Sequence, residues 1–137
     1  MGEFDDWNRK IIEEFRSTGG KVGGRFEGAN LLLLHTTGAR SGQKRVNPVA
    51  YQAVGDDYAV FGSKAGAPTN PDWYHNLVAH PDVTVEVGTD TFQAKARVAE
   101  ADERNRIWTR QKELVPSFAQ YEEKTTRPIP VIVITRN

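Results

Sequence analysis

Cations and hydroxyl groups crowd a ten-residue stretch that also contains two glycines, Gly38 and Gly42. Glycine lets backbone N–H groups approach an anion, arginine offers a planar fork of donors to a phosphate or carboxylate, and serine adds a neutral donor. The stretch is not a Walker phosphate loop, because no Gly-Lys-Ser/Thr ends a GxxxxG pattern. It suits an anionic ligand, and a solvated hairpin turn is the plainer alternative; the side chains concerned are Thr36, Thr37, Arg40, Ser41, Lys44 and Arg45.

Two further stretches have side chains suited to a flat or anionic ligand. Residues 61–66 end an expected strand and continue as Ser63, Lys64, Ala65 and Gly66, a loop small enough to admit a ring or a phosphate. Residues 70–77 place Trp73 and Tyr74 together near the start of an expected helix. An ordinary turn and an aromatic anchor between helix and sheet are the respective alternatives.

Several other chemistries are disfavoured by what the chain contains. It has no cysteine, which removes disulfides, thiolate nucleophiles and cysteine-bound metals. His75 and His80 are five residues apart, about 140° around a helix, so they do not form the i, i+4 pair of a zinc site. His35 lies in an apolar run and is interpreted as a satisfied interior histidine. No serine has the flanking residues of a nucleophile elbow.

The charge balance and the ends of the chain bear on partners and location. The 137 residues contain 18 basic and 18 acidic side chains, so the overall field favours no nucleic-acid or membrane partner. No apolar run approaches the roughly 20 residues that span a bilayer. The N-terminus has no basic region followed by an apolar one, so we expect no signal peptide and a cytoplasmic protein.

An amphipathic helix is predicted over residues 3–17, with Phe4, Trp7, Ile11 and Phe15 on one face and Ile12 at its edge. Residues 18–30 contain several glycines, and we expect them to form a linker. We divide the chain into residues 1–20, the helix and the start of this linker, and residues 21–137, a single domain. The helix has three interpretations: a core helix, a lid over a site, or a surface anchor that gives weak membrane contact.

The remaining pattern predicts a mainly β, α+β domain. Strands are expected over residues 31–35, 44–54, 58–62, 83–87, 91–98 and 129–134. One short helix should start at Pro71 and end near Pro81, and another should be capped by Asp102. Because Pro48 cannot donate to a ladder, its stretch must be an edge, a bulge or a place where something other than a strand lies alongside. About six antiparallel strands with helical inserts indicate a barrel.

Four motifs in this order resemble the deazaflavin-dependent nitroreductase family. They run from Leu33 to Gly42, from Arg45 to Val49, from Ser63 to Pro68 and from Asn70 to Leu77, within a resemblance that spans about residues 31–134. The resemblance implies a split antiparallel β-barrel and coenzyme F420 as the two-electron donor. It also leaves open a homodimer.

The resemblance implies a role for each motif, because the distal half of F420 carries a phosphodiester and an oligoglutamate tail. Arg40, Ser41 and Arg45 would hold the phosphate, and Lys44 would meet the tail. Asn47, Pro48 and Val49 would lie along the ring, with the loop of Ser63, Lys64, Ala65 and Gly66 opposite and Trp73 and Tyr74 closing the ring end.

With no thiol available, the cofactor must supply the redox chemistry while the protein orients it. A hydride would pass to a small electrophilic acceptor such as a quinone, an enone or a nitro compound, and a proton would come from solvent or a hydroxyl. Ser63 is the family-matched candidate for catalysis, followed by Tyr51 and Tyr121. Nitroimidazole-reducing members have a tyrosine where this chain has Ala50. They also have several tyrosines in the loop before the last strand, which we expect here over residues 115–121 and which retains only Tyr121. These departures leave the acceptor open. The competing functions are an F420 carrier without turnover and a module that binds FMN or haem, with His35 or His75 as axial ligand.

Overall fold

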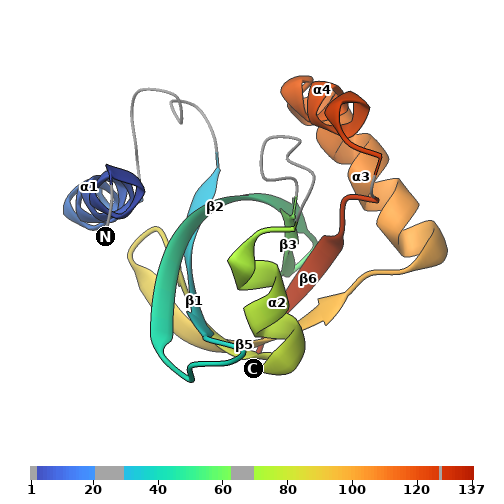
Figure 1. Cartoon of the computed structure of the whole chain (residues 1–137). Helices are drawn as coiled ribbons and strands as arrows, with labels where there is room; N and C mark the ends of the chain where they lie inside the picture. The colour runs from blue at the N-terminus through green and yellow to red at the C-terminus, as the bar shows by residue number, and fades with distance from the viewer. Residues whose placement is uncertain (1–2, 21–29, 63–69, 127) are drawn as a thin grey trace.

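A computed structural model describes residues 3–20, 30–62, 70–126 and 128–137. Within these residues, six antiparallel strands close into a barrel in the order β1-β2-β3-β6-β5-β4, with four helices around it (Figure 1). The predicted mainly β barrel with helical inserts is therefore confirmed. The strands are β1 (Leu31–Thr37), β2 (Lys44–Val54), β3 (Asp57–Phe61), β4 (Asp82–Val87), β5 (Asp90–Val98) and β6 (Val131–Arg136), and the helices are α1 (Glu3–Thr18), α2 (Asp72–Ala79), α3 (Ala101–Leu114) and α4 (Ser117–Lys124).

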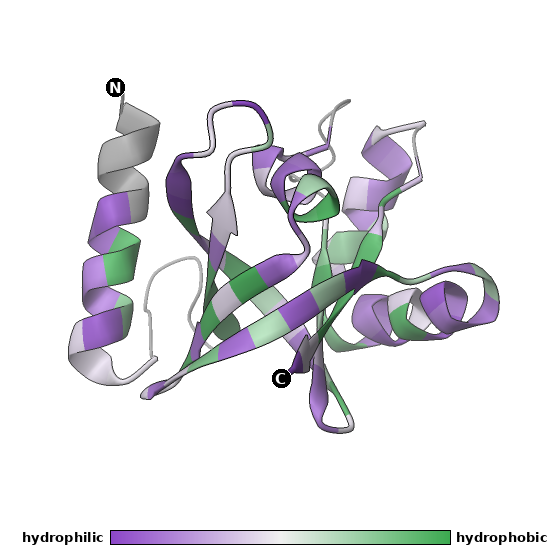
Figure 2. Ribbon diagram, turned by 90° about the horizontal axis from the view of Figure 1, so that it is seen from below, coloured by the Kyte–Doolittle hydropathy of each residue, from purple (hydrophilic) through white to green (hydrophobic). Residues whose placement is uncertain are grey.

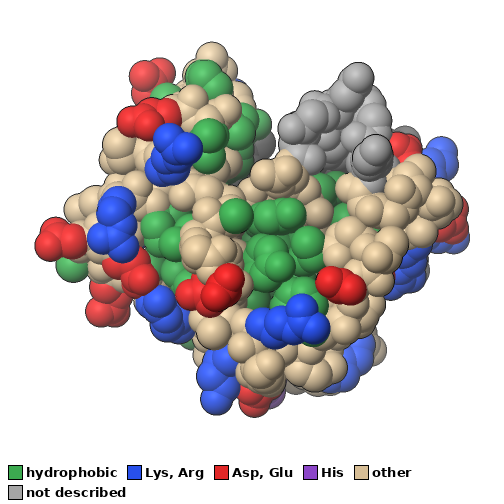
Figure 3. Space-filling view, turned by 180° about the vertical axis from the view of Figure 1, so that it is seen from behind, with side chains coloured by type: hydrophobic (Ala, Val, Ile, Leu, Met, Phe, Trp, Pro, Cys, Tyr) green, Lys and Arg blue, Asp and Glu red, His purple; other side chains and the backbone are tan. Residues whose placement is uncertain are grey.

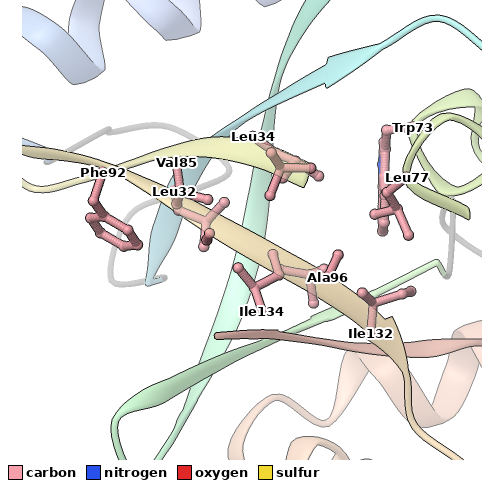
Figure 4. Close-up of a cluster of buried hydrophobic side chains, with 12 residues drawn as sticks. Leu32, Leu34, Trp73, Leu77, Val85, Phe92, Ala96, Ile132 and Ile134 are labelled. Atoms are coloured by element: carbon pink, nitrogen blue, oxygen red, sulfur yellow. The ribbon is translucent and has the colours of Figure 1, made fainter. Parts of the chain in front are cut away.

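The barrel interior is filled by alternate residues of the strands, because successive side chains of a strand point to opposite faces. Figure 2 shows this alternation of hydropathy along the strands. Helix α2 adds Trp73 and Leu77 to the interior, so it packs into the barrel rather than lying on its surface (Figure 4). The strand residues of this interior cluster are Leu32, Leu34, Val60, Val83, Val85, Phe92, Ala94, Ala96, Ile132 and Ile134.

Two smaller clusters lie on the outer face of the sheet. Helix α1 packs Phe15 against Leu31 and Leu33, so the apolar run of β1 is buried on both faces as predicted. Helices α3 and α4 cover β3 and β6 with Ile107, Trp108 and Phe118. We call these the α1 cluster and the α3–α4 cluster. The side chains of Phe4 and Trp7, predicted to share the apolar face of α1, lie outside the described residues.

The sequence prediction missed one element and displaced several boundaries by one or two residues. Residues 115–121 were expected to form a loop, but α4 begins at Ser117. Pro116 precedes its first turn, and Ala119, Gln120 and Glu122 follow, all compatible with a helix. Helix α3 begins at Ala101, so its N-cap residue, Glu100, lies two positions before the predicted cap Asp102. The last strand covers residues 131–136 rather than 129–134.

Candidate active site

Strand β2 is longer than either of its neighbours and pairs with each of them over a different part of its length. Its first half, residues 44–50, pairs with β1, from Lys44 opposite Thr37 to Ala50 opposite Leu31. Pairing with β3 begins only at Tyr51, opposite Val60. In the described part of the chain, no strand pairs with the outer edge of residues 44–50. The barrel is therefore split along this edge, where a ligand can lie against the backbone.

Pro48 is accommodated by this open edge. Tyr51 N–H donates to the carbonyl of Asn30 across the β1–β2 ladder, at 3.0 Å. In an antiparallel pair the direction of the backbone groups alternates, so residues 45, 47, 49 and 51 face β1 while 46, 48 and 50 face the open edge. The N–H that Pro48 lacks would thus point away from β1, and the proline removes no ladder hydrogen bond. The predicted edge position of Pro48 is confirmed.

The two faces of this half-strand differ in what they present. Asn47 pairs with Leu34 and Val49 with Leu32, so both lie on the inner face with the barrel core. Arg45 is opposite Thr36 on the same face, at the end of the barrel. Val46 lies on the outer face, against the α1 cluster. A ligand at the open edge therefore meets a guanidinium at one end and half-buried Asn47 and Val49 farther along.

The turn before β2 is closed by its own backbone. Gly38 N–H donates to Gln43 O at 2.7 Å, and Gly42 N–H donates to Gly38 O at 3.0 Å. A Cβ on Gly38 would lie 2.5 Å from Ser41 Oγ, so the serine side chain would have to shift, and Gly42 has a φ of +70°, a conformation that favours glycine. Ser41 Oγ accepts the N–H of Gln43. The turn is thus a defined platform for the charged side chains it carries.

Three exposed cations surround this turn, namely Arg40, Lys44 and Arg45. Lys44 Nζ donates to Thr37 Oγ1 at 3.0 Å, and Arg45 contacts Gln43 Oε1 at 3.4 Å, so both partners are neutral. Among the residues that the structure describes, no carboxylate pairs with any of the three. Three cations without an acidic partner at one end of the open edge fit an anionic ligand.

Asn76 joins the turn to helix α2, a role that sequence reasoning did not assign. Its side chain is buried, with Oδ1 accepting the N–H of Ala39 at 3.0 Å and Nδ2 donating to Thr36 Oγ1 at 3.2 Å. The available signal was an amide next to Leu77 on the buried face of an otherwise apolar helix. Asn76 therefore positions the turn without facing a ligand.

The other predicted cofactor residues fall into two groups. Ser63, Lys64, Ala65 and Gly66 lie outside the described residues. Trp73 is buried in the barrel interior and Tyr74 is half-buried beside it, so Trp73 at least serves as the anchor between helix and sheet. The chain just before residue 63 packs closely on Pro130, because Gly62 N–H donates to Pro130 O and a Cβ on Gly62 would lie 2.7 Å from the Pro130 ring.

The two candidate tyrosines lie in different clusters. Tyr51 packs against the barrel interior, edge-on to Tyr58 with ring centroids 5.2 Å apart, and lines a cavity of about 530 Å³ with Arg136. Burial, and then the proximity of Tyr58, raises the pKa of Tyr51, so its phenol is protonated at neutral pH. Tyr121 belongs to the α3–α4 cluster, 5.2 Å from Phe118. The structure does not bring these two phenols together.

His35 is satisfied, as predicted, but lies on the outer face of the barrel rather than inside it. Its Nε2 is 2.6 Å from Glu86 Oε2, and Arg16 of α1 donates to both oxygens of the same carboxylate. The hydrogen bond from Arg16 lowers the pKa of Glu86 despite its burial, with His35 adding to the effect. This trio ties α1 to β1 and β4, whereas His75 is exposed on α2.

No helix among the described residues is long and apolar enough to cross a membrane.

Comparison with known proteins gives consistent matches over nearly the whole chain. A family model described as F420H(2)-dependent quinone reductase matches residues 7–136. The F420H(2)-dependent quinone reductase Rv1261c of Mycobacterium tuberculosis (strain H37Rv) is 41% identical over 126 residues, which cover 89% of this chain and 85% of that protein.

Solved structures agree with these sequence matches. A structure described as an F420-H2 dependent reductase, FDR-A, has a TM-score of 0.70 and 39% identity, covering 77% of this chain and 93% of that one. A structure described as a domain-swapped dimer has a TM-score of 0.73 and 35% identity, covering 96% of this chain and 99% of that one.

Proposed function

This chain belongs to the F420H(2)-dependent quinone reductase family and is an F420-dependent oxidoreductase, and we propose that its acceptor is a quinone. The observation that supports the cofactor site most directly is the trio of Arg40, Lys44 and Arg45 at one end of the open edge of β2. A long cofactor fits this edge, because its anionic distal half would meet the cations and its flat, weakly polar ring would lie on half-buried Asn47 and Val49. The family and the relative are both described as quinone reductases, which supports a quinone as the acceptor.

We propose that the cationic turn holds the distal half of F420, with Arg40, Ser41 and Arg45 at the phosphate and Lys44 at the tail. Arginine suits the phosphate because its fork donates two hydrogen bonds, whereas lysine acts as a point charge on a flexible stem. Asn47, Pro48 and Val49 then lie along the ring. Opposite them we place the loop of Ser63, Lys64, Ala65 and Gly66, and at the ring end Tyr74 beside the buried Trp73.

The residues of the chain bind, orient and protect the cofactor. Bound F420, when reduced, supplies a hydride to the acceptor. The cationic turn fixes one end of the binding site, and the closed backbone of Gly38 to Gln43 holds the turn in place before binding, which lowers the entropic cost of association. Ser63 is our first candidate for delivering a proton to the reduced acceptor. Tyr51 holds its proton at neutral pH, and Tyr121 we assign to the wall of the acceptor site.

A carrier without turnover would need the same cofactor contacts, so binding alone does not separate it from an enzyme. Menadione should reoxidise reduced F420 faster in the presence of the protein than in its absence. The rate should saturate as the menadione concentration rises. Matched assays with an enone and a nitro compound test the choice of acceptor. Bound F420 that is protected from all three acceptors would overturn the enzyme and favour the carrier.

Cofactor selectivity is tested separately by fluorescence titration with F420 and with FMN. We expect F420 to bind at least about tenfold more tightly, a difference of about 1.4 kcal/mol. FMN lacks the oligoglutamate tail, so the comparison reports on the cationic turn. Equal binding of both would contradict the proposed placement of the cofactor.

We further propose a homodimer in which α1 is exchanged between copies. One structural relative is a domain-swapped dimer, and α1 here reaches the barrel through a self-contained set of contacts: the α1 cluster and the Arg16–Glu86 ion pair, with 2.8 Å between Nη2 and Oε2. The same contacts serve an α1 from either copy. Light scattering should then give twice the mass of one chain at micromolar concentration, and a monomer at all concentrations would overturn the exchange.

A further inference from the structure

Three aromatic rings, those of Phe61, Trp108 and Phe118, lie in mutual contact next to the end of the β2–β3 pairing. Phe61 ends β3, one residue after the last pair between β3 and β2. Its ring centroid is 5.8 Å from Trp108 on α3 and 5.7 Å from Phe118 on α4. Trp108 and Phe118 are themselves 6.1 Å apart, and Phe118 is 5.2 Å from Tyr121. Tyr121 is therefore two ring contacts away from the end of the open edge.

Helix α3 is held firmly to the barrel, whereas α4 depends on α3. Buried Gln52 of β2 donates to Ile107 O at 3.1 Å and to Gln111 Oε1 at 3.2 Å. Helix α4 has only eight residues, of which Phe118 alone is buried. A helix of that length is not stable by itself in water, so its place must come from tertiary contacts.

A single carboxylate makes the polar contacts that the structure gives between these two helices. Trp108 Nε1 donates to Glu122 Oε2 at 2.5 Å, and Lys112 Nζ donates to Glu122 Oε1 at 3.1 Å. Burial raises the pKa of Glu122, but the hydrogen bonds from Trp108 and Lys112, together with the positive charges of Lys112 and Arg104, bring it below its ordinary value. The carboxylate is thus charged at neutral pH and accepts both bonds. Glu122 follows Tyr121 directly, so its bond to Trp108 restrains the backbone that carries the phenol.

We propose that Trp108 and Glu122 are positioning residues for the acceptor site, setting α4 and Tyr121 relative to the end of the open edge of β2. The inference rests on the proposed function, in which Tyr121 walls the quinone. Neither residue needs to touch cofactor or acceptor. Cofactor binding should be indifferent to this pair, because the cationic turn lies at the other end of β2 and is fixed by Asn76 instead.

The test uses Trp108→Phe and Glu122→Ala in the full chain, with menadione as acceptor. Both variants remove the hydrogen bond, and phenylalanine keeps most of the apolar ring. We expect KM for menadione to rise about twofold to tenfold, the ratio that matches one net hydrogen bond of 0.5–1.5 kcal/mol. The kcat and the dissociation constant for F420 should stay within about twofold of wild type. Glu122→Ala keeps the test informative if the buried Trp108→Phe variant does not fold.

Two further variants act as rescue and control. Glu122→Gln still offers an oxygen to Trp108 and should restore the wild-type KM, and Lys112→Met leaves the Trp108–Glu122 bond in place and should also match wild type. A merely structural role predicts instead a lower melting temperature with unchanged KM in the folded variants, which would overturn the proposal. Wild-type protein that binds F420 but reduces no quinone would overturn the proposed acceptor itself, an outcome visible before any variant is made.

Discussion

The two halves of β2 are one continuous strand with opposite properties. Residues 44–50 pair on one edge only, begin with two exposed cations and contain a proline. Residues 51–54 pair with β3 and include Gln52, which is 7% exposed and hydrogen-bonded to α3. In the first half the edge that faces away from β1 is unpaired and available to a ligand, while in the second half β3 occupies that edge.

The difference shows how a small barrel can combine a binding edge with a stable core. Strand β3 ends at Phe61, so its pairing with β2 extends no farther than Tyr51 among the described residues. What opens the site is thus the length of β3 rather than any distortion of β2. Substitutions in the first half should therefore change binding with little effect on stability, and those in the second half should do the reverse.

The largest effect is expected for Arg45→Ala in the first half. Losing a charge-assisted hydrogen bond costs about 1.5–3 kcal/mol, so F420 should bind at least about tenfold more weakly in a fluorescence titration. The free energy of unfolding should be unchanged, because Arg45 is exposed. Arg110→Ala, an exposed arginine on α3, is the matched control. Unchanged affinity in Arg45→Ala would place the anion site elsewhere.

In the second half, Gln52→Leu should lower the free energy of unfolding by about 1–3 kcal/mol, because Gln111 loses its buried partner. Binding of F420 to the folded protein should match wild type. Denaturant unfolding and a parallel titration measure the two quantities. Gln120→Leu, an exposed glutamine on α4, controls for the change of residue type. If Gln52→Leu weakened F420 as much as Arg45→Ala does, the two halves would not be separable.

Asn76→Ala tests whether the turn before β2 must be held in place. Removing the acceptor for Ala39 N–H should weaken F420 by about twofold to tenfold, corresponding to about 0.5–1.5 kcal/mol. Thr36→Val removes only the partner of Asn76 Nδ2 and should leave affinity closer to wild type. Equal affinities for wild type and Asn76→Ala would show that the turn is held by its own backbone alone.

Pro48→Ala should have a smaller effect. Because the missing N–H faces the open edge, alanine breaks no ladder bond. The change should destabilise the protein by only about 0.4–1 kcal/mol through the greater entropy of the unfolded chain. Thermal unfolding compared with Ala53→Gly, in the half of β2 that pairs with β3, provides the contrast. A stabilising Pro48→Ala substitution would mean that the proline is strained and is kept for another reason.

The smallest effect concerns the helix that covers the outer face of the first half. Arg16, opposed by burial and aided by His35, holds the pKa of Glu86 below its ordinary 4.5. A depressed carboxyl pKa stabilises the fold above that ordinary value, and the contribution is lost as pH falls through the lower folded pKa. Wild type should therefore lose up to about 1 kcal/mol more than Glu86→Gln on acidification from about pH 6 to pH 3. Parallel loss in both proteins would exclude this pair as the cause.

Local rules were sufficient for most elements of the fold. The apolar run of Leu31 to Leu34 indicated a strand buried on both faces, and Pro71 and Pro81 bracketed α2 correctly. The alternation of apolar and polar residues predicted the two strands of the β4–β5 hairpin. Helix α4 was missed because a short amphipathic segment after a proline has no period strong enough to distinguish it from a loop. The cations of the turn were found because their residue types and their spacing with glycine are visible in the chain.

Only the tertiary structure decided which side chains meet. Residue type singled out Tyr51 and Tyr121 alike, but alternation turns Tyr51 into the barrel interior while α4 holds Tyr121 on the outer face. Asn76 and the pair of Trp108 and Glu122 act across 37 and 14 positions of chain, respectively, and no local pattern announces a partner at such separations. The sequence determined that this chain has a glycine-containing turn rich in cations and a strand that tolerates proline. Where β3 stops pairing, and so where the edge of β2 becomes open, depended on how the distant strands close around a common core.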